Sequence, residues 1–207
     1  GDVYYYSKMS REVKTKKTEK KTENDMILLG NLHVNEGRYD IAIEIFSEIL
    51  QNNRNNAQAL LGRGTAYALK RSLESALRDF SRVVEEDKTN VDALKRRGVI
   101  YLDSNRPARA LCDFNQVIAM GKGDFATYLR RGKTLMDLKE YSRARMDLKQ
   151  AIRLDKTNAQ AWLFLGRCES MTGGCIDGIR AFETCLKLCK TADLRFVSSI
   201  NIAQLWK

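Results

Sequence analysis

Three short stretches of this 207-residue sequence place arginine directly before glycine, and they read LLGRGTAY from Leu60, ALKRRGVIYL from Ala93 and YLRRGKTL from Tyr128. A guanidinium donates paired hydrogen bonds to a carboxylate or a phosphate. These arginines could therefore hold acidic side chains within the protein, or they could bind an acidic partner. Choosing between the two roles requires the elements that carry them.

Few other residues offer chemistry. The sequence contains no phosphate-binding glycine loop, no nucleophile–base set and no quartet of metal ligands, and His33 is its only histidine. The five cysteines are odd in number and form no CxxC pair, which is typical of reduced thiols in an intracellular protein. Cys185 and Cys189, one helical turn apart, are expected to be small packing residues. We expect a protein that is not an enzyme, has no cofactor or metal, and is cytoplasmic or else nuclear.

Composition favours a helical, globular chain with a basic end. Hydrophobic residues make up 43% of it and charged residues 30%, enough to bury a core. The single proline permits an all-helical chain. No apolar run approaches the ~20 residues that span a bilayer, so we expect no membrane segment. The net charge is +10, and residues 1–21 hold seven Lys/Arg against three Asp/Glu, which leaves +4 at this end.

Glycines recur every 34 residues through most of the chain, at Gly30, Gly64, Gly98, Gly132 and Gly166. A small residue follows twelve positions after each glycine, at Ala42, Ala76, Ala110, Ala144 and Gly178. A bulky apolar residue follows four positions later, at Phe46, Phe80, Phe114, Leu148 and Phe182. Small residues let paired helices approach closely, and the bulky residue fills the space beside them. The period therefore predicts five helical hairpins, at residues 23–56, 57–90, 91–124, 125–158 and 159–192.

This pattern resembles the tetratricopeptide repeat (TPR) family, whose 34-residue helix–turn–helix motif carries glycine, alanine and phenylalanine at these registers. The sequence departs from the motif in lacking the late proline, which is replaced by Arg54, Lys88, Lys122, Lys156 and Lys190. The resemblance implies an all-α fold, a right-handed α-α superhelix of five helix–turn–helix repeats. Residues 1–22 would form a basic N-terminal extension and residues 193–207 a capping helix. Leu194, Val197, Leu205 and either Ile200 or Asn201 are expected on the packing side of that helix.

The arginines that precede glycine have matching acids one helix later. With each copy numbered from 1, position 7 is arginine and position 23 is aspartate in copies two, three and four, whereas copies one and five are apolar at both positions. We predict structural ion pairs within these repeats, Arg63–Asp79, Arg97–Asp113 and Arg131–Asp147. His33 lies in the register of a packing tyrosine, so a packed side chain is expected there.

A second set of cations has no matching acid register. In TPR arrays, positions 2, 5, 6 and 9 of the first helix line a concave groove that binds extended partner segments. The resemblance thus implies a partner-binding groove that becomes more basic along the chain, made by Asn31, Thr65, Lys95, Arg96, Leu129, Arg130, Lys133, Phe164 and Arg167. An ordinary solvated helix face is the alternative. The carboxylate clamp of TPR proteins that bind chaperone tails is not reproduced in any register.

These features favour a protein–protein interaction scaffold whose basic groove binds an extended, partly acidic peptide segment. The chain is expected to be a monomer or a weak end-to-end dimer. Two alternatives stay open. One is nucleic-acid binding through the basic N-terminal tail and the groove, and the other is an architectural segment of a larger TPR protein.

Overall fold

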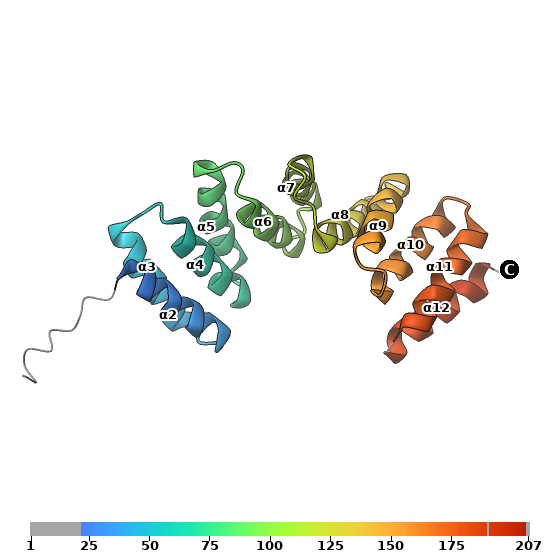
Figure 1. The fold of residues 1–207 in the computed structure, drawn as a ribbon, viewed down its shortest axis with the longest axis horizontal. Helices are drawn as coiled ribbons and strands as arrows, with labels where there is room; N and C mark the ends of the chain where they lie inside the picture. The colour runs from blue at the N-terminus through green and yellow to red at the C-terminus, as the bar shows by residue number, and fades with distance from the viewer. Residues whose placement is uncertain (1–21, 190, 206–207) are drawn as a thin grey trace, which may run out of the picture. The chain divides into compact units, whose positions relative to one another are not determined.

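The computed structural model describes residues 22–189 and 191–205, which form eleven α-helices and no β-strand (Figure 1). The helices are α2 (Glu23–Asn35), α3 (Tyr39–Asn52), α4 (Ala57–Leu69), α5 (Leu73–Glu86), α6 (Val91–Asp103), α7 (Pro107–Ala119), α8 (Phe125–Asp137), α9 (Tyr141–Leu154), α10 (Ala159–Met171), α11 (Cys175–Leu188) and α12 (Ala192–Leu205). The predicted all-α fold of five hairpins and a final helix is confirmed. Apart from Thr22, the predicted basic extension lies outside the described residues.

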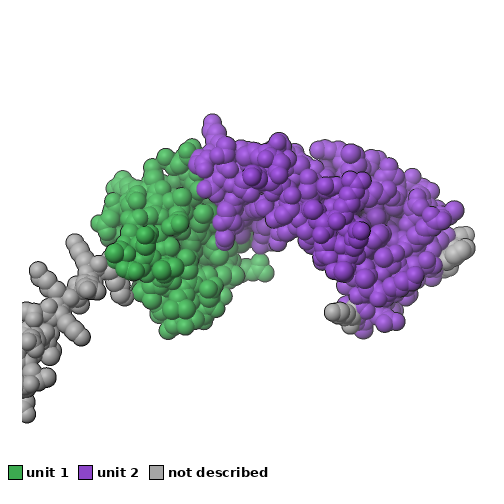
Figure 2. Space-filling model, in the orientation of Figure 1, with its two compact units in different colours: residues 1–86 green, residues 87–207 purple. Residues whose placement is uncertain are grey.

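The chain divides into two compact units, residues 1–86 and residues 87–207, coloured separately in Figure 2. In the first unit α2 packs on α3, α3 on α4 and α4 on α5. In the second unit consecutive helices from α6 to α12 pack in the same way, and α10 also contacts α8 and α12. Each unit is therefore a stack in which every described helix covers the apolar side of its neighbour in sequence.

Most first helices begin at a side chain that caps them. Asn56, Asn90, Asp124 and Asn158 each accept a hydrogen bond from the backbone N–H three residues later, at 2.8–3.1 Å. This bond satisfies one of the amide groups that a helix start leaves without a partner. The caps are 34 residues apart, so the period fixes where these helices start.

The turn inside every hairpin contains one residue with a left-handed backbone. Its φ angle lies between 56° and 84°, and the residues, again 34 apart, are Gly37, Arg71, Asn105, Lys139 and Gly173. Glycine takes this conformation without strain, and asparagine tolerates it better than most residues. Arg71 and Lys139 have no such advantage, so two of the five turns carry a local energetic cost.

The periodic glycines lie where paired helices touch. A Cβ atom added at Gly30, Gly64, Gly98 or Gly166 would lie 2.6–2.7 Å from a phenylalanine ring of the second helix in the same repeat. Gly62 is a further contact of this kind, because its Cβ would lie 2.3 Å from Cζ of Phe46. The Phe46 ring is thus enclosed between the two first helices of its unit.

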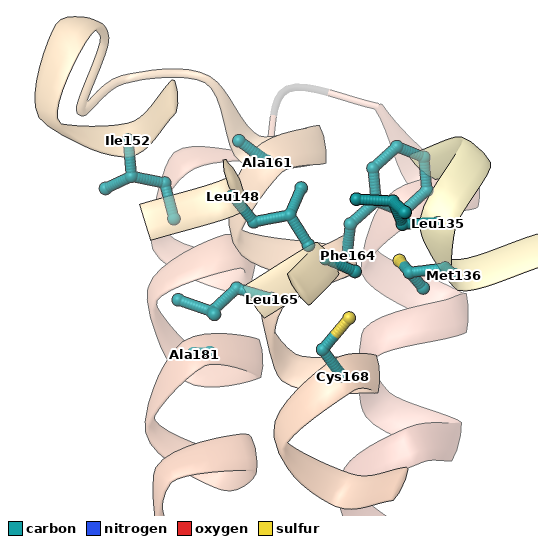
Figure 3. Close-up of a cluster of buried hydrophobic side chains, with 10 residues drawn as sticks. Leu135, Met136, Leu148, Ile152, Ala161, Phe164, Leu165, Cys168 and Ala181 are labelled. Carbon is teal, nitrogen blue, oxygen red and sulfur yellow. The ribbon is translucent and has the colours of Figure 1, made fainter. Parts of the chain in front are cut away.

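One buried cluster of the second unit is built from helices α8 to α11. Figure 3 shows Leu135 and Met136 of α8 beside Phe164 of α10, in a cluster that continues to Leu148 of α9 and Ala181 of α11. Phe164 is 8% exposed, and the exposed edge of this core residue faces the surface described below.

The final helix, α12, covers α11 with a face that differs in part from the predicted one. Leu194 and Leu205 pack on the cluster that includes Phe182 and Cys185, as expected, together with Ile202. Val197 is instead 40% exposed, and of the two alternatives Ile200 is 41% exposed whereas Asn201 is partly buried. Ser198 is fully buried and donates to Sγ of Cys185 at 3.3 Å. The small serine lets α12 approach closely and rotates the helix away from the expected stripe.

Candidate interaction groove

The arginines at position 7 lie against the aspartates at position 23. Nε and Nη2 of Arg63 donate to the two carboxylate oxygens of Asp79 at 2.9 and 2.8 Å. The corresponding distances are 2.9 and 2.7 Å for Arg97–Asp113, and 2.7 and 2.6 Å for Arg131–Asp147. All three carboxylates are buried. The hydrogen bonds to Asp79 raise the pKa of Arg63 although burial opposes this.

Two of these arginines also contact the helix before their own. Nη1 of Arg63 donates to the hydroxyl of Ser47 on α3 at 3.0 Å, and Nη1 of Arg131 donates to Oδ1 of Asn115 on α7 at 2.8 Å. Each of these guanidiniums therefore connects three helices of two successive repeats. These contacts with Asp79, Ser47, Asp147 and Asn115 are internal, in keeping with the structural pairs predicted at position 7.

Two hollows lie side by side on α8 and α10 in the second unit. The first has a volume of about 330 Å³ and is lined by Phe125, Ala126, Leu129, Arg130, Lys133, Asn158, Gln160 and Phe164. The second has a volume of about 430 Å³ and is lined by Lys133, Met136, Asp137, Tyr141, Phe164, Arg167, Ser170, Met171, Phe182, Asn201, Gln204 and Leu205. Lys133 and Phe164 belong to both linings, so we treat the two hollows as one surface, the α8–α10 groove.

The groove combines apolar surface with cations that have no internal partner. Within the described residues, the side chains of Arg130, Lys133 and Arg167 form no hydrogen bond or ion pair, and all three are exposed. The first hollow contains two of these cations and no acid, and the second contains two cations and Asp137. This surface can donate charge-assisted hydrogen bonds to carboxylates and accept apolar side chains beside them.

Five of the nine predicted groove residues meet here: Leu129, Arg130, Lys133, Phe164 and Arg167. Two more, Lys95 and Arg96 on α6, line neither hollow and are already paired with acids. Nζ of Lys95 lies 2.8 Å from Oδ2 of Asp124, and Nε of Arg96 lies 3.0 Å from Oδ2 of Asp92, one turn earlier on the same helix.

Asn31 and Thr65 belong to the first unit. Asn31 is exposed on α2, and the Thr65 hydroxyl donates to the backbone oxygen of Leu61 at 2.7 Å. Neither residue lines a described hollow. The structure thus concentrates the predicted cationic surface on two helices of the second unit.

Several residues that line the groove were not predicted to belong to it. Asn201, Gln204 and Leu205 come from α12, which lies outside the 34-residue period, and Tyr141 begins a second helix. Glu169 occupies the register at which the repeat motif has a packing tyrosine. It is buried, and its Oε1 lies 3.0 Å from Nζ of Lys149 and its Oε2 lies 3.3 Å from Nη1 of Arg145. The only sequence signal for this buried ion-paired residue was the mismatch between glutamate and the tyrosine of the repeat motif.

Neither a metal site nor a membrane-crossing helix is present in the described part of the chain. It holds no cluster of three or more His, Cys, Asp or Glu side chains arranged for a metal ion. None of its helices has the length and apolar character needed to cross a membrane. The Sγ atoms of Cys185 and Cys189 lie 3.5 Å apart and are buried, in agreement with the packing role expected for them.

Comparison with known proteins was made at the level of sequence and of fold. The tetratricopeptide repeat family matches residues 27–91 and residues 125–158. No curated protein matches the chain. A crystal structure of MamA is 19% identical and covers 80% of this chain and 91% of its own, with a TM-score of 0.74. MamA from Desulfovibrio magneticus RS-1 is 17% identical, and the match covers 80% of this chain and 94% of that one, with a TM-score of 0.74. YrrB, described as a TPR protein with an unusual peptide-binding site, is 16% identical, covering 91% and 97%, with a TM-score of 0.76. At these identities the likeness concerns the fold.

Proposed function

This chain belongs to the tetratricopeptide repeat family and is a protein–protein interaction scaffold, and we propose that its α8–α10 groove binds an extended, partly acidic protein segment. Proteins of this fold are in general interaction scaffolds rather than enzymes. The observation that carries the proposal is the contrast among the cations. Lys95 and Arg96 are paired with acids, whereas Arg130, Lys133 and Arg167 line the groove and have no side-chain partner among residues 22–189 and 191–205.

The two hollows suggest the pattern of the bound segment. Leu129 in the first hollow and Met136 in the second are seven residues apart on α8, which corresponds to ~10 Å along the helix axis. A segment in the polyproline II conformation rises ~3.1 Å per residue and has three residues per turn, so it covers that distance in about three residues and returns the side chain to the same side. Two apolar side chains about three positions apart would enter the two hollows, and an acidic residue between them would meet Lys133. The peptide-binding site named for the structural neighbour YrrB is in keeping with such a role.

The proposal is tested by fluorescence anisotropy with a labelled peptide that contains Leu-Asp-Glu-Leu between glycine–serine flanks. The double variant Arg130→Glu/Lys133→Glu removes two groove cations. Loss of these charge-assisted bonds is expected to weaken binding about tenfold or more. A matched control, Arg143→Glu/Arg153→Glu, makes the same change in net charge on α9, outside both hollows.

Binding that is unchanged in the groove variant, or that falls equally in the control, contradicts the proposal. The nucleic-acid alternative is separated by a labelled single-stranded oligonucleotide. If the chain binds nucleic acid, its affinity for the oligonucleotide should fall steeply with salt and should be lost when residues 1–21 are deleted. If the peptide binds on α8 and α10, the same deletion should leave the affinity for the peptide unchanged.

A further inference from the structure

A third hollow, in the first unit, is lined by arginines and shares no residue with the α8–α10 groove. It has a volume of about 460 Å³, and its lining consists of Ser47, Leu50, Gln51, Arg54, Arg63 and Arg82. The lining includes three guanidiniums, an amide and a hydroxyl, and it contains no aspartate or glutamate. We call it the arginine hollow. Its chemistry is that of a site for an anion.

Two of the three guanidiniums are held in place by the protein. Arg63 is fixed by both oxygens of Asp79 and by the hydroxyl of Ser47. Nε and Nη2 of Arg82 both donate to Oδ1 of Asn55, at 3.1 and 2.7 Å. A ligand that binds fixed donors does not have to order flexible side chains first, which lowers the entropic cost of binding.

The positive charge of the hollow is only partly balanced from within. Asp79 neutralises Arg63, but Arg82 is held by a neutral amide oxygen, and Asn55 in turn donates to Oε1 of Glu86 at 2.8 Å. Arg54 is exposed and makes no hydrogen bond or ion pair within the described chain. Two guanidinium charges therefore face the hollow without a carboxylate in direct contact.

The excess charge is not a requirement of the repeat. Position 26, which is Arg82 in copy two, is Gln116 and Gln150 in copies three and four. Both of those copies keep the same arginine–aspartate pair at positions 7 and 23. The fold thus accepts a neutral side chain at this register, and the third cation of the arginine hollow needs another explanation.

We propose that the arginine hollow binds a doubly charged phosphate group, namely the phosphate monoester of a phosphorylated side chain or free phosphate. Two uncompensated guanidiniums match a charge of about −2, and arginine forks fit phosphate oxygens in pairs. The Ser47 hydroxyl accepts from Arg63, so its proton is available to a phosphate oxygen. A nucleic-acid phosphate is a singly charged diester and matches the charge of the hollow less well.

The test follows backbone amide NMR shifts of the 207-residue chain during titration with O-phosphoserine, inorganic phosphate and dimethyl phosphate at pH 7.5. O-phosphoserine and inorganic phosphate are expected to shift the amides of residues 47–55 and Arg82, with dimethyl phosphate binding more weakly. A phosphoserine peptide that binds more tightly than phosphate identifies a phosphorylated protein as the source, and equal affinities identify free phosphate. Equal binding of the diester would contradict the proposal.

Arg82→Gln supplies the residue that copies three and four carry, so the fold should tolerate it. It is expected to weaken O-phosphoserine binding about tenfold through loss of a charge-assisted contact. The control Arg78→Gln lies on the same helix, where the guanidinium of Arg78 contacts Ser75, and it is expected to leave binding unchanged. Absence of shifts around the hollow, or equal affinity of Arg82→Gln and wild type, would overturn the proposal.

Discussion

Lys95 on α6 donates a 2.8 Å hydrogen bond to Oδ2 of Asp124, the residue that caps α8. The other oxygen, Oδ1, accepts from the backbone N–H and the hydroxyl of Thr127 at 2.9 and 2.6 Å. One carboxylate thus joins the first helices of two successive repeats. Burial by itself would raise the pKa of Asp124, but the hydrogen bonds from Lys95 and Thr127 outweigh it and lower that pKa to about 2.

The lowered pKa of Asp124 predicts a loss of stability in acid. Its unfolded value is near 3.8, so the stabilisation is complete above about pH 4 and disappears as the pH falls towards 2. Asp124→Asn keeps a capping side chain of the kind present at Asn90 and Asn158, but removes the charge. The difference in free energy of unfolding between wild type and this variant, measured in urea from pH 6 to pH 2, should shrink through that window. A difference that does not vary with pH would refute the assignment.

Alanine at Gly62 is predicted to destabilise the first unit. Its methyl group would lie 2.3 Å from Cζ of Phe46, and the ring is already packed against Gly30. Overpacking typically costs about 1–3 kcal/mol, which exceeds the gain of about 1 kcal/mol in helix propensity. Gly132→Ala is the comparison, because its methyl would lie 3.0 Å from Cγ of Leu148, a smaller overlap than the 2.3 Å at Gly62. Thermal unfolding should show the larger loss for Gly62→Ala, and the reverse order would exclude the enclosed ring as the cause.

Glycine at Lys139 is predicted to stabilise the second unit. Lys139 has φ near 62°, a conformation that costs most residues about 1–2 kcal/mol and glycine very little. Glycine also raises the entropy of the unfolded chain, which offsets part of this gain. The net increase in the free energy of unfolding is therefore expected to be about 0.5–1 kcal/mol. Gly173→Ala, at the same position of the next turn, should destabilise by a similar amount. Chemical denaturation of both variants checks the pair, and a change of the same sign in both would be inconsistent with turn strain.

The five thiols are predicted to fall into two reactivity classes. Cys112 and Cys175 are exposed, whereas Cys168, Cys185 and Cys189 are buried. Burial, reinforced by the neighbouring Glu169, raises the pKa of Cys168 to about 11, and burial together with Cys185 raises that of Cys189 to about 11. Because the thiolate is the reacting form, iodoacetamide at pH 8 should label the exposed pair first. Mass spectrometry of the native protein follows the order of labelling. Early modification of Cys168 would contradict its buried position.

The 34-residue period was enough to predict the all-α hairpins, because it repeats both the helix-crossing glycine and the side chain that fills the crossing. Contacts of the Arg131–Asp147 type could also be predicted from the sequence. Positions 7 and 23 are arginine and aspartate in the same three copies, and both positions are apolar in the other two copies. Both signals arise from packing that is the same in every repeat.

The groove was less predictable because its partners do not repeat. Arg96 meets Asp92 on its own helix, and Lys95 meets Asp124, at a register where three other copies have asparagine. No comparison of registers reveals contacts that occur once. Asn201 lines the groove because of the rotation of α12 about its axis. Hydrophobic spacing left Ile200 and Asn201 as alternatives on the packing side, and the burial of the small Ser198 places Asn201 there.

The arginines that connect three helices have a consequence for denaturation. If the second helix that carries Asp79 or Asp147 separated from the first helix of its own hairpin, a carboxylate would be left in an apolar interior without the counter-charge of Arg63 or Arg131. The contacts of the same two arginines with Ser47 and Asn115 would spread that disturbance to the preceding hairpin. Forms with one detached helix are thereby disfavoured, and the two hairpins that each of these arginines connects should melt together instead of one after the other.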